Sequence, residues 1–256
     1  MGKILFIDVD GTLYDTNKSL PESAKTAIWK AKHNGHLVAI STGRAPFMIE
    51  PVLKELEIDS YVCFNGQYVV LKGEVIHTGA IEKEYLGEVT RFAGEQSHPL
   101  VYLDEKKMVS SIEEHPDVET GISSLKFPYP EVDETYFENH PVFQTLIFCT
   151  AEEQLQYERS FPHLKFVRWH PVSCDVLPEG GSKAKGMQVL LDRVGMSMDD
   201  AIAFGDGLND VEMLDAAGIG VAMGNALPEV KERADYIAEH VNAGGLAKAM
   251  HELKLI

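Results

Sequence analysis

The chain begins with an apolar run that ends in two carboxylates and a glycine turn. Ile-Leu-Phe-Ile at 4–7 leads directly into Asp8-Val-Asp10-Gly-Thr. An uninterrupted apolar run that stops at a glycine is typical of a buried strand in an α/β sheet, and ligands bind beyond the carboxyl ends of such strands. Two like charges about 4 Å apart repel by roughly 4 kcal/mol at an effective dielectric constant near 20. We therefore expect a cation or a shared proton between Asp8 and Asp10.

Composition and charge disfavour several classes of protein. The 256 residues are 45% hydrophobic and 25% charged, which is ordinary for a globular protein. A net charge of −17 disfavours binding to nucleic acid or to an anionic membrane, because both favour basic surfaces. No apolar run approaches the roughly 20 residues that span a bilayer. Three widely spaced cysteines (Cys63, Cys149 and Cys174) form neither a disulfide framework nor a metal-binding spacing. We expect a cytoplasmic protein, and the sequence carries no signal for an oligomeric state.

The first 80 residues alternate between strand and helix patterns. Strands are expected at Lys3–Val9, His36–Ser41 and Tyr61–Phe64, and helices at Pro21–Asn34 and Pro46–Leu56. This β-α-β-α-β order predicts parallel strands joined by right-handed crossovers.

The same alternation returns after residue 181 and is absent between the two stretches. Residues 81–180 hold most of the prolines and aromatic residues and have shorter strand patterns, which favours a separate α+β module. The predicted fold class is α/β, with a doubly wound, Rossmann-like parallel sheet formed by 1–80 and 181–256. The α+β domain at 81–180 is inserted into it.

Four motifs follow predicted strands of this sheet or open a helix beside it. They are Asp8-Val-Asp10-Gly-Thr, Ser41-Thr42-Gly43-Arg44, Ser182-Lys183-Ala-Lys-Gly and Gly205-Asp206-Gly-Leu-Asn209-Asp210. Together they supply carboxylates for a hard cation, hydroxyl and amide donors for phosphoryl oxygens, and one ammonium. Phosphoryl transfer needs this equipment, because its catalysis is mostly positioning and charge neutralisation.

The motifs, in this order, resemble those of the haloacid dehalogenase superfamily of Mg²⁺-dependent phosphatases. The match is best to the Cof-type branch with its larger, type IIB cap, and it extends to Asn65-Gly66 and to Gly220-Val-Ala-Met-Gly-Asn225. The resemblance covers both ends of the chain, and it covers the middle only by position and size. It implies an enzyme with a catalytic core, a cap domain that closes over the active site, and small phosphomonoesters as substrates. Sugar phosphates, phosphorylated cofactors and nucleotides are all compatible with it.

The resemblance also implies catalytic roles. Asp8 would attack phosphorus to give an aspartyl-phosphate, and Asp10 would protonate the leaving oxygen and later deprotonate the hydrolytic water. Thr42 would grip the phosphoryl group, and Lys183 would offset negative charge. The implied Mg²⁺ ligands are Asp8, Asp10 through its main-chain carbonyl, Asp206 and Asp210. The implied phosphate-binding residues are Val9, Thr42, Gly43, Lys183 and Asn209.

Other interpretations of these residues and of the chain stay open at this point. Thr42 could cap the next helix, Asp210 could bind the metal through water or cap a helix, and Arg44 could pair with a core acid instead of substrate. Among functions, a phosphomutase or phosphotransferase would share the same acids. A signalling receiver or a non-catalytic module that binds a phosphorylated ligand are further alternatives.

Overall fold

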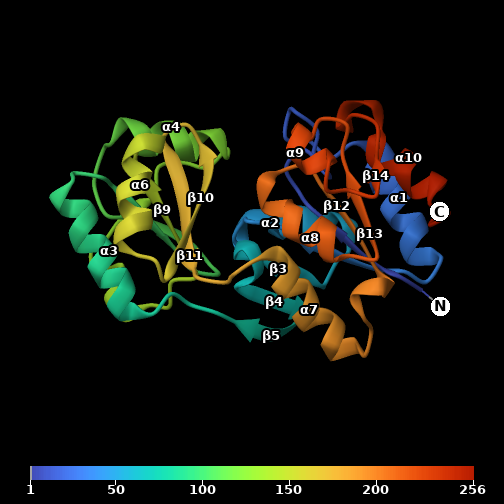
Figure 1. Ribbon diagram of the computed structural model, residues 1–256, viewed down its shortest axis with the longest axis horizontal. Helices are drawn as coiled ribbons and strands as arrows, with labels where there is room; N and C mark the ends of the chain where they lie inside the picture. The colour runs from blue at the N-terminus through green and yellow to red at the C-terminus, as the bar shows by residue number, and fades with distance from the viewer. Residues whose placement is uncertain (1) are drawn as a thin grey trace. The chain divides into compact units, whose positions relative to one another are not determined.

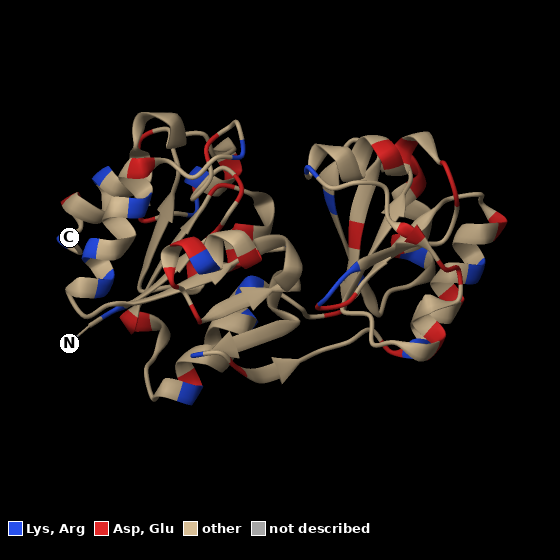
Figure 2. Cartoon of the chain, turned by 180° about the vertical axis from the view of Figure 1, so that it is seen from behind, with Lys and Arg blue, Asp and Glu red and all other residues tan. Residues whose placement is uncertain are grey.

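The computed structural model describes residues 2–256, and the chain divides into two compact units. The first unit comprises the chain up to Arg44, Met48–Thr78 and Ser182–Ile256, and the second comprises Ala45–Phe47 and Gly79–Gly181. In Figure 1 the blue, cyan, orange and red segments accordingly share one unit, and the green and yellow segments form the other. Acidic residues, coloured red in Figure 2, occur on helices and loops of both units.

The first unit is built on a sheet of eight strands. They are β1 (Ile4–Ile7), β2 (Leu37–Ser41), β3 (Tyr61–Cys63), β4 (Tyr68–Leu71), β5 (Glu74–Thr78), β12 (Ala201–Gly205), β13 (Ile219–Ala222) and β14 (Tyr236–Ile237). Their order is β14-β13-β12-β1-β2-β3-β4-β5, and all neighbours from β14 to β3 are parallel. From β1 the chain adds β2 and β3 on one side of the sheet, and later it adds β12, β13 and β14 on the other side of β1. This doubly wound arrangement confirms the predicted fold class.

Helices cover both faces of this sheet. They are α1 (Glu22–His33), α2 (Pro46–Leu56), α7 (Lys183–Val194), α8 (Val211–Ala216), α9 (Pro228–Lys231) and α10 (Gly245–Glu252), with short 3₁₀ turns η1 (Phe64–Gly66), η2 (Met198–Asp200), η3 (Leu208–Asp210) and η4 (Val241–Ala243). Because side chains alternate along a strand, Ile4 and Phe6 of β1 share one face and pack in a cluster with Met187 and Leu190 of α7. Burial of a side chain such as Phe6 contributes about 1.5–3 kcal/mol.

The carboxyl ends of the central strands meet at one edge of the sheet. Ile7 of β1 lies opposite Ile40 of β2 and opposite Phe204 of β12. Since the three strands are parallel and in register, the residues that follow them emerge side by side. The winding direction reverses between β1 and β12, which is where doubly wound sheets bind ligands.

A hairpin extends the sheet beyond the strands that the sequence predicts. β4 and β5 pair antiparallel and are joined by Lys72 and Gly73, whose φ angles are +50° and +78°. Two consecutive positive φ angles are the mark of a type I′ turn, which matches the twist of the two strands. The chain leaves the first unit directly after this hairpin.

The second unit has its own sheet and core. Its strands are β6 (Leu100–Leu103), β7 (Met108–Ser110), β8 (Glu131–Val132), β9 (Gln144–Phe148), β10 (Leu164–His170) and β11 (Ser173–Pro178), in the order β10-β11-β9-β6-β7-β8. All pairs except β7 with β8 are antiparallel. Its helices are α3 (Lys83–Glu95), α4 (Pro116–Ser124), α5 (Tyr136–Asn139) and α6 (Ala151–Ser160). Leu86 of α3, Tyr157 of α6, Tyr102 and Ile147 pack in one apolar cluster, so this unit is an α+β module.

Within residues 2–256, no helix combines the length and the apolar character that a membrane crossing requires.

Candidate active site

Asp8 extends the ladder of β1 by one residue into the site. Its amide donates to the Phe204 carbonyl at 2.9 Å, and the residue is only 6% exposed. The chain then turns back, because the Val9 carbonyl accepts hydrogen bonds from the amides of Leu13 and Tyr14. Gly11, in this turn, has a φ of +80°. A β-carbon on Gly11 would lie 2.2 Å from an Asp206 oxygen, so glycine allows the loop to approach that carboxylate.

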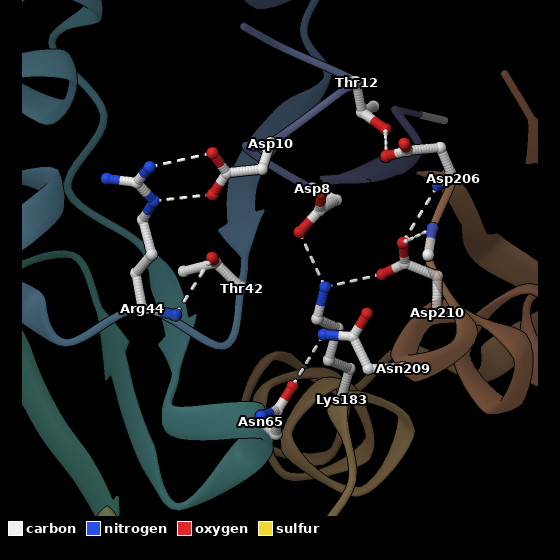
Figure 3. Close-up of polar contacts among 11 residues, drawn as sticks. Asp8, Asp10, Thr12, Thr42, Arg44, Asn65, Lys183, Asp206, Asn209 and Asp210 are labelled. Atoms are coloured by element: carbon white, nitrogen blue, oxygen red, sulfur yellow. Dashed lines mark hydrogen bonds and ion pairs between the residues drawn. The ribbon is translucent and has the colours of Figure 1, made fainter. Parts of the chain in front are cut away.

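Lys183, the first residue of α7, joins two of the acids. Its side chain is fully buried, and its Nζ donates to Asp8 Oδ1 at 2.6 Å and to Asp210 Oδ1 at 2.5 Å (Figure 3). Burial alone would lower the pKa of Lys183, but the charges of Asp210 and Asp8 raise it above its ordinary value, so the ammonium stays protonated. Burial has the larger influence on Asp8 and raises its pKa well above the usual range, although Lys183 opposes this.

Asp206 follows β12 and is held by two neutral donors. The Thr12 hydroxyl donates to Asp206 Oδ1 at 3.0 Å, and Asn225 Nδ2 donates to Asp206 Oδ2 at 3.1 Å. Asn225 Nδ2 also donates to the Gly11 carbonyl at 2.8 Å, so one amide fixes both the carboxylate and the turn beside it. Burial, together with the charge of Asp210, raises the pKa of Asp206 to about 6.

Asp210 accepts three hydrogen bonds with its two carboxylate oxygens. Its Oδ2 accepts from the backbone amides of Asp206 and Gly207, both at 2.9 Å, while its Oδ1 accepts from Lys183. The residue is fully buried, and Gly205 makes room for it, since a β-carbon there would lie 2.5 Å from its Cγ. Asp210 therefore orients Lys183 and the loop that carries Asp206.

The donor set of this site suits a hard divalent cation. Carboxylate oxygens of Asp8, Asp206 and Asp210 lie within 4.8 Å of one another. The three acids face one buried ammonium, so a negative excess is left. Burial is the largest cause of the raised pKa values of Asp8 and Asp206, and the charges of neighbouring carboxylates add to it. An all-oxygen set with excess negative charge is what Mg²⁺ binds in proteins. A divalent ion would cancel the excess. The residues present fit the metal.

Asp10 points to a different partner. Arg44 donates to both of its oxygens, at 2.6 and 2.8 Å, and Lys18 Nζ donates to Oδ1 at 2.5 Å. Burial by itself would raise the pKa of Asp10, but these hydrogen bonds and charges, those of Arg44 first, lower it to about 2. Asp10 is therefore ionised in this structure, which is the form of a base and not of an acid. Of the two interpretations of Arg44, the pairing with a core acid is observed.

The turn after β2 and the loop after β12 meet through one amide side chain. Thr42 is 2% exposed, and its hydroxyl accepts from the Arg44 amide at 3.1 Å. Asn209 Nδ2 donates to Asn65 Oδ1 at 2.9 Å, and the Asn65 amide group lies against Gly43. The predicted phosphate-binding residues Thr42, Gly43 and Asn209 therefore belong to one connected group.

The structure brings four of the predicted site residues together. Lys183 bonds to both Asp8 and Asp210, and oxygens of Asp8, Asp206 and Asp210 lie within 4.8 Å of one another. The sequence assigned no role to four residues that hold side chains of the site. Thr12 and Asn225 donate to Asp206, Lys18 donates to Asp10, and Asn65 accepts from Asn209. Thr12, Asn65 and Asn225 lie within motifs that the sequence analysis singled out, so their positions carried a signal. Lys18 lies outside every motif, and only the fold of its loop shows that it reaches Asp10.

Comparison with known proteins identifies the family. The profile of the haloacid dehalogenase-like hydrolase family matches residues 5–250. The chain belongs to this family. It is 43% identical over 254 residues to the protein of Bacillus subtilis (strain 168) named "Putative phosphatase YkrA". The aligned residues cover 99% of this chain and 98% of that protein.

Solved structures agree with this assignment. A protein of Geobacillus kaustophilus HTA426 is 49% identical and superposes with a TM-score of 0.94 over 100% of both chains. The subclass IIB sugar phosphatase BT4131 is 33% identical and superposes with a TM-score of 0.90 over 99% of this chain and 100% of that one. The resemblance inferred from the motifs is thus confirmed. The chain is a hydrolase that acts on phosphoric monoesters, in a family whose phosphatases are generally metal-dependent.

Proposed function

We propose that this enzyme hydrolyses small phosphomonoesters with Mg²⁺ through an aspartyl-phosphate at Asp8. The observation that carries the proposal is the buried Asp8 carboxylate at the end of β1, bound to Lys183 and within 4.8 Å of oxygens of Asp206 and Asp210. A carboxylate approaches a phosphate dianion only where its charge is compensated. Lys183 supplies one positive charge, and Mg²⁺ held by Asp8, the Asp10 carbonyl and Asp206 would supply the rest and polarise the phosphoryl group.

The first half-reaction transfers the phosphoryl group to the protein. An Asp8 oxygen forms a bond to phosphorus while the bond from phosphorus to the substrate oxygen breaks, and the leaving oxygen takes a proton from the protonated carboxyl group of Asp10. Thr42 and Gly43 hold phosphoryl oxygens by hydrogen bonds, and Asn209 and Lys183 contact the same group. These donors stabilise the charge that spreads over the phosphoryl oxygens as the bonds change.

The second half-reaction returns Asp8 to its starting state. Asp10 removes a proton from water, the water oxygen bonds to phosphorus, and the bond from phosphorus to Asp8 breaks to release inorganic phosphate. The ion pairs with Arg44 and Lys18 keep Asp10 in the ionised form that this step requires. For Asp10 to protonate the leaving oxygen in the first step, we propose that these ion pairs break and that Asp10 then carries the proton it removed from water in the preceding turnover.

Sugar phosphates are the first substrate class to test, because BT4131, a sugar phosphatase, is similar to this chain along its whole length. We expect a panel of sugar phosphates, phosphorylated cofactors and nucleotides, assayed for phosphate release with Mg²⁺, to give turnover on at least one sugar phosphate. Absence of phosphate release from every member of the panel would contradict the proposal.

Removal of the metal is expected to stop the reaction. Loss of several kcal/mol of charge stabilisation corresponds to a rate reduction of about 100-fold or more after treatment with EDTA, and added Mg²⁺ should restore the rate. Asp206→Asn serves as the matched variant, and it should need a higher Mg²⁺ concentration for half-maximal activity. Full activity in excess EDTA would show that the acids of this site act without a metal.

A further inference from the structure

The segment after β3 has an unusual backbone. Phe64, Asn65 and Gly66 have φ angles of +51°, +50° and +103° in succession. Non-glycine residues rarely adopt positive φ, and for a bulky residue such as Phe64 the conformation is strained. Such conformations persist where the surrounding structure enforces them, and they cluster at functional sites.

The strained segment is tied by its backbone to the turn after β2. The Asn65 amide donates to the Thr42 carbonyl at 3.1 Å, and the Phe64 amide donates to the Arg44 carbonyl at 3.1 Å. These two bonds flank Gly43, so the segment fixes the conformation of the turn that carries the proposed phosphoryl donors. The left-handed conformation at Asn65 is therefore coupled to this turn.

The Asn65 side chain lies between that turn and the loop after β12. It is 3% exposed, and its Oδ1 accepts from Asn209 Nδ2 at 2.9 Å (Figure 3). A β-carbon on Gly43 would lie 3.1 Å from Asn65 Nδ2 and 3.2 Å from Asn65 Oδ1, so the amide group packs directly on Gly43. One buried side chain thus lies between Gly43 and Asn209 and contacts both.

We propose that Asn65 is a positioning residue that sets the spacing of the two phosphoryl-binding loops, with Gly43 on one side and Asn209 on the other. The proposal rests on the proposed function, because it assigns both loops to the phosphoryl group. Asn65 acts through Asn209, whose amide it orients. Asparagine suits the position because it tolerates the left-handed conformation and carries an acceptor for Asn209 Nδ2.

The test is a double-mutant cycle on binding of inorganic phosphate, which requires no turnover. Asn65→Gly keeps the left-handed backbone accessible and removes the side chain. With Mg²⁺ present, we expect calorimetric titration to show roughly 10-fold weaker phosphate binding in Asn65→Gly, as is typical for loss of a supporting hydrogen bond. In the Asn209→Ala background, Asn65→Gly should have little further effect. In enzyme assays kcat/KM should follow the same pattern.

Lys72→Gly is the matched control, since Lys72 is an exposed residue with a φ of +50° in the β4–β5 turn. It should leave phosphate affinity unchanged. Phosphate affinity equal to the wild type in Asn65→Gly, or effects that add fully to those of Asn209→Ala, would overturn the proposal. Intact coupling without any turnover would instead refute the proposed hydrolysis and leave this assignment standing.

A second variant decides the question if Asn65→Gly fails to fold. Asn65→Asp keeps the size, the acceptor for Asn209 and the tolerance of positive φ, and it adds a carboxylate beside Gly43. Because the added charge is buried, we expect a lower melting temperature than that of the wild type. We also expect at least 10-fold weaker phosphate binding, because the carboxylate repels the phosphate anion beside Gly43. Unchanged phosphate affinity in Asn65→Asp would show that this position has no influence on the phosphoryl-binding loops.

Discussion

Asp8→Asn is expected to abolish phosphate release, with kcat reduced by about 1000-fold or more. The amide has almost the shape of the carboxylate, and its oxygen can still accept the hydrogen bond from Lys183 that Asp8 Oδ1 accepts at 2.6 Å. Folding should therefore be preserved. The amide lacks the negative charge and the nucleophilicity that attack on phosphorus requires. Steady-state assays on the best substrate of the panel measure the effect.

Stability of the same variant separates loss of chemistry from loss of structure. Burial raises the pKa of Asp8, so its charge is costly in the metal-free protein, and Asp8→Asn should melt at the same or a higher temperature than the wild type. Asp15→Asn is a suitable control, because Asp15 accepts only from backbone amides of its own turn among its described contacts. An Asp8→Asn protein that keeps more than a tenth of wild-type activity would contradict the role of Asp8 as nucleophile.

Lys183→Met is expected to lower both stability and activity. The side chain is fully buried between Asp8 and Asp210, so its removal leaves two buried carboxylates without their cation. Breaking a buried ion pair by removing one partner typically costs about 3–5 kcal/mol. Chemical denaturation of the metal-free protein measures this loss. Lys185→Met, on the same helix but exposed, should change neither stability nor activity.

The loss of stability in Lys183→Met should depend on pH. A carboxyl group whose pKa is raised in the folded state binds more protons there than in the unfolded chain, so stability falls as pH rises from its ordinary pKa, about 4, to its folded pKa. The pKa of Asp8 is already raised, and loss of the ammonium raises it further. The difference from the wild type should be smaller at pH 5 than at pH 8. A difference that shrinks as pH rises would contradict this electrostatic account.

The doubly wound sheet was predictable because its signals are local. Each central strand is an apolar run closed by a glycine or a polar motif, and the intervening helices have clear starts and ends. The second unit was predicted only in outline, since β7, β8 and β11 are short or continuous in pattern with their neighbours. There the pairing of distant segments, such as β6 with β9, decides which residues become strands.

The positions of site residues were predictable where a motif directly follows a strand. They were less predictable where a side chain has more than one possible hydrogen-bonding partner. The approach of Asp8 and Asp206 follows from the parallel strands β1 and β12, which end at one edge, whereas Lys183 opens helix α7 and is not placed by that rule. The orientation of Asp10 does not follow from spacing. It depends on Arg44, and on Lys18 from a loop whose conformation no sequence pattern fixes.

The central claim is that Asp8 forms a bond to phosphorus, and capture of that bond tests it most directly. Wild-type enzyme mixed with a turnover substrate and Mg²⁺, then quenched rapidly in acid, should yield a peptide that contains Asp8 and carries the mass of one phosphoryl group. Reduction with borohydride should convert that residue to homoserine. A phosphoryl group found on another residue would contradict the account. So would rapid turnover by the wild type when neither the wild type nor a variant with slowed hydrolysis, such as Asp10→Asn, yields a phosphorylated peptide.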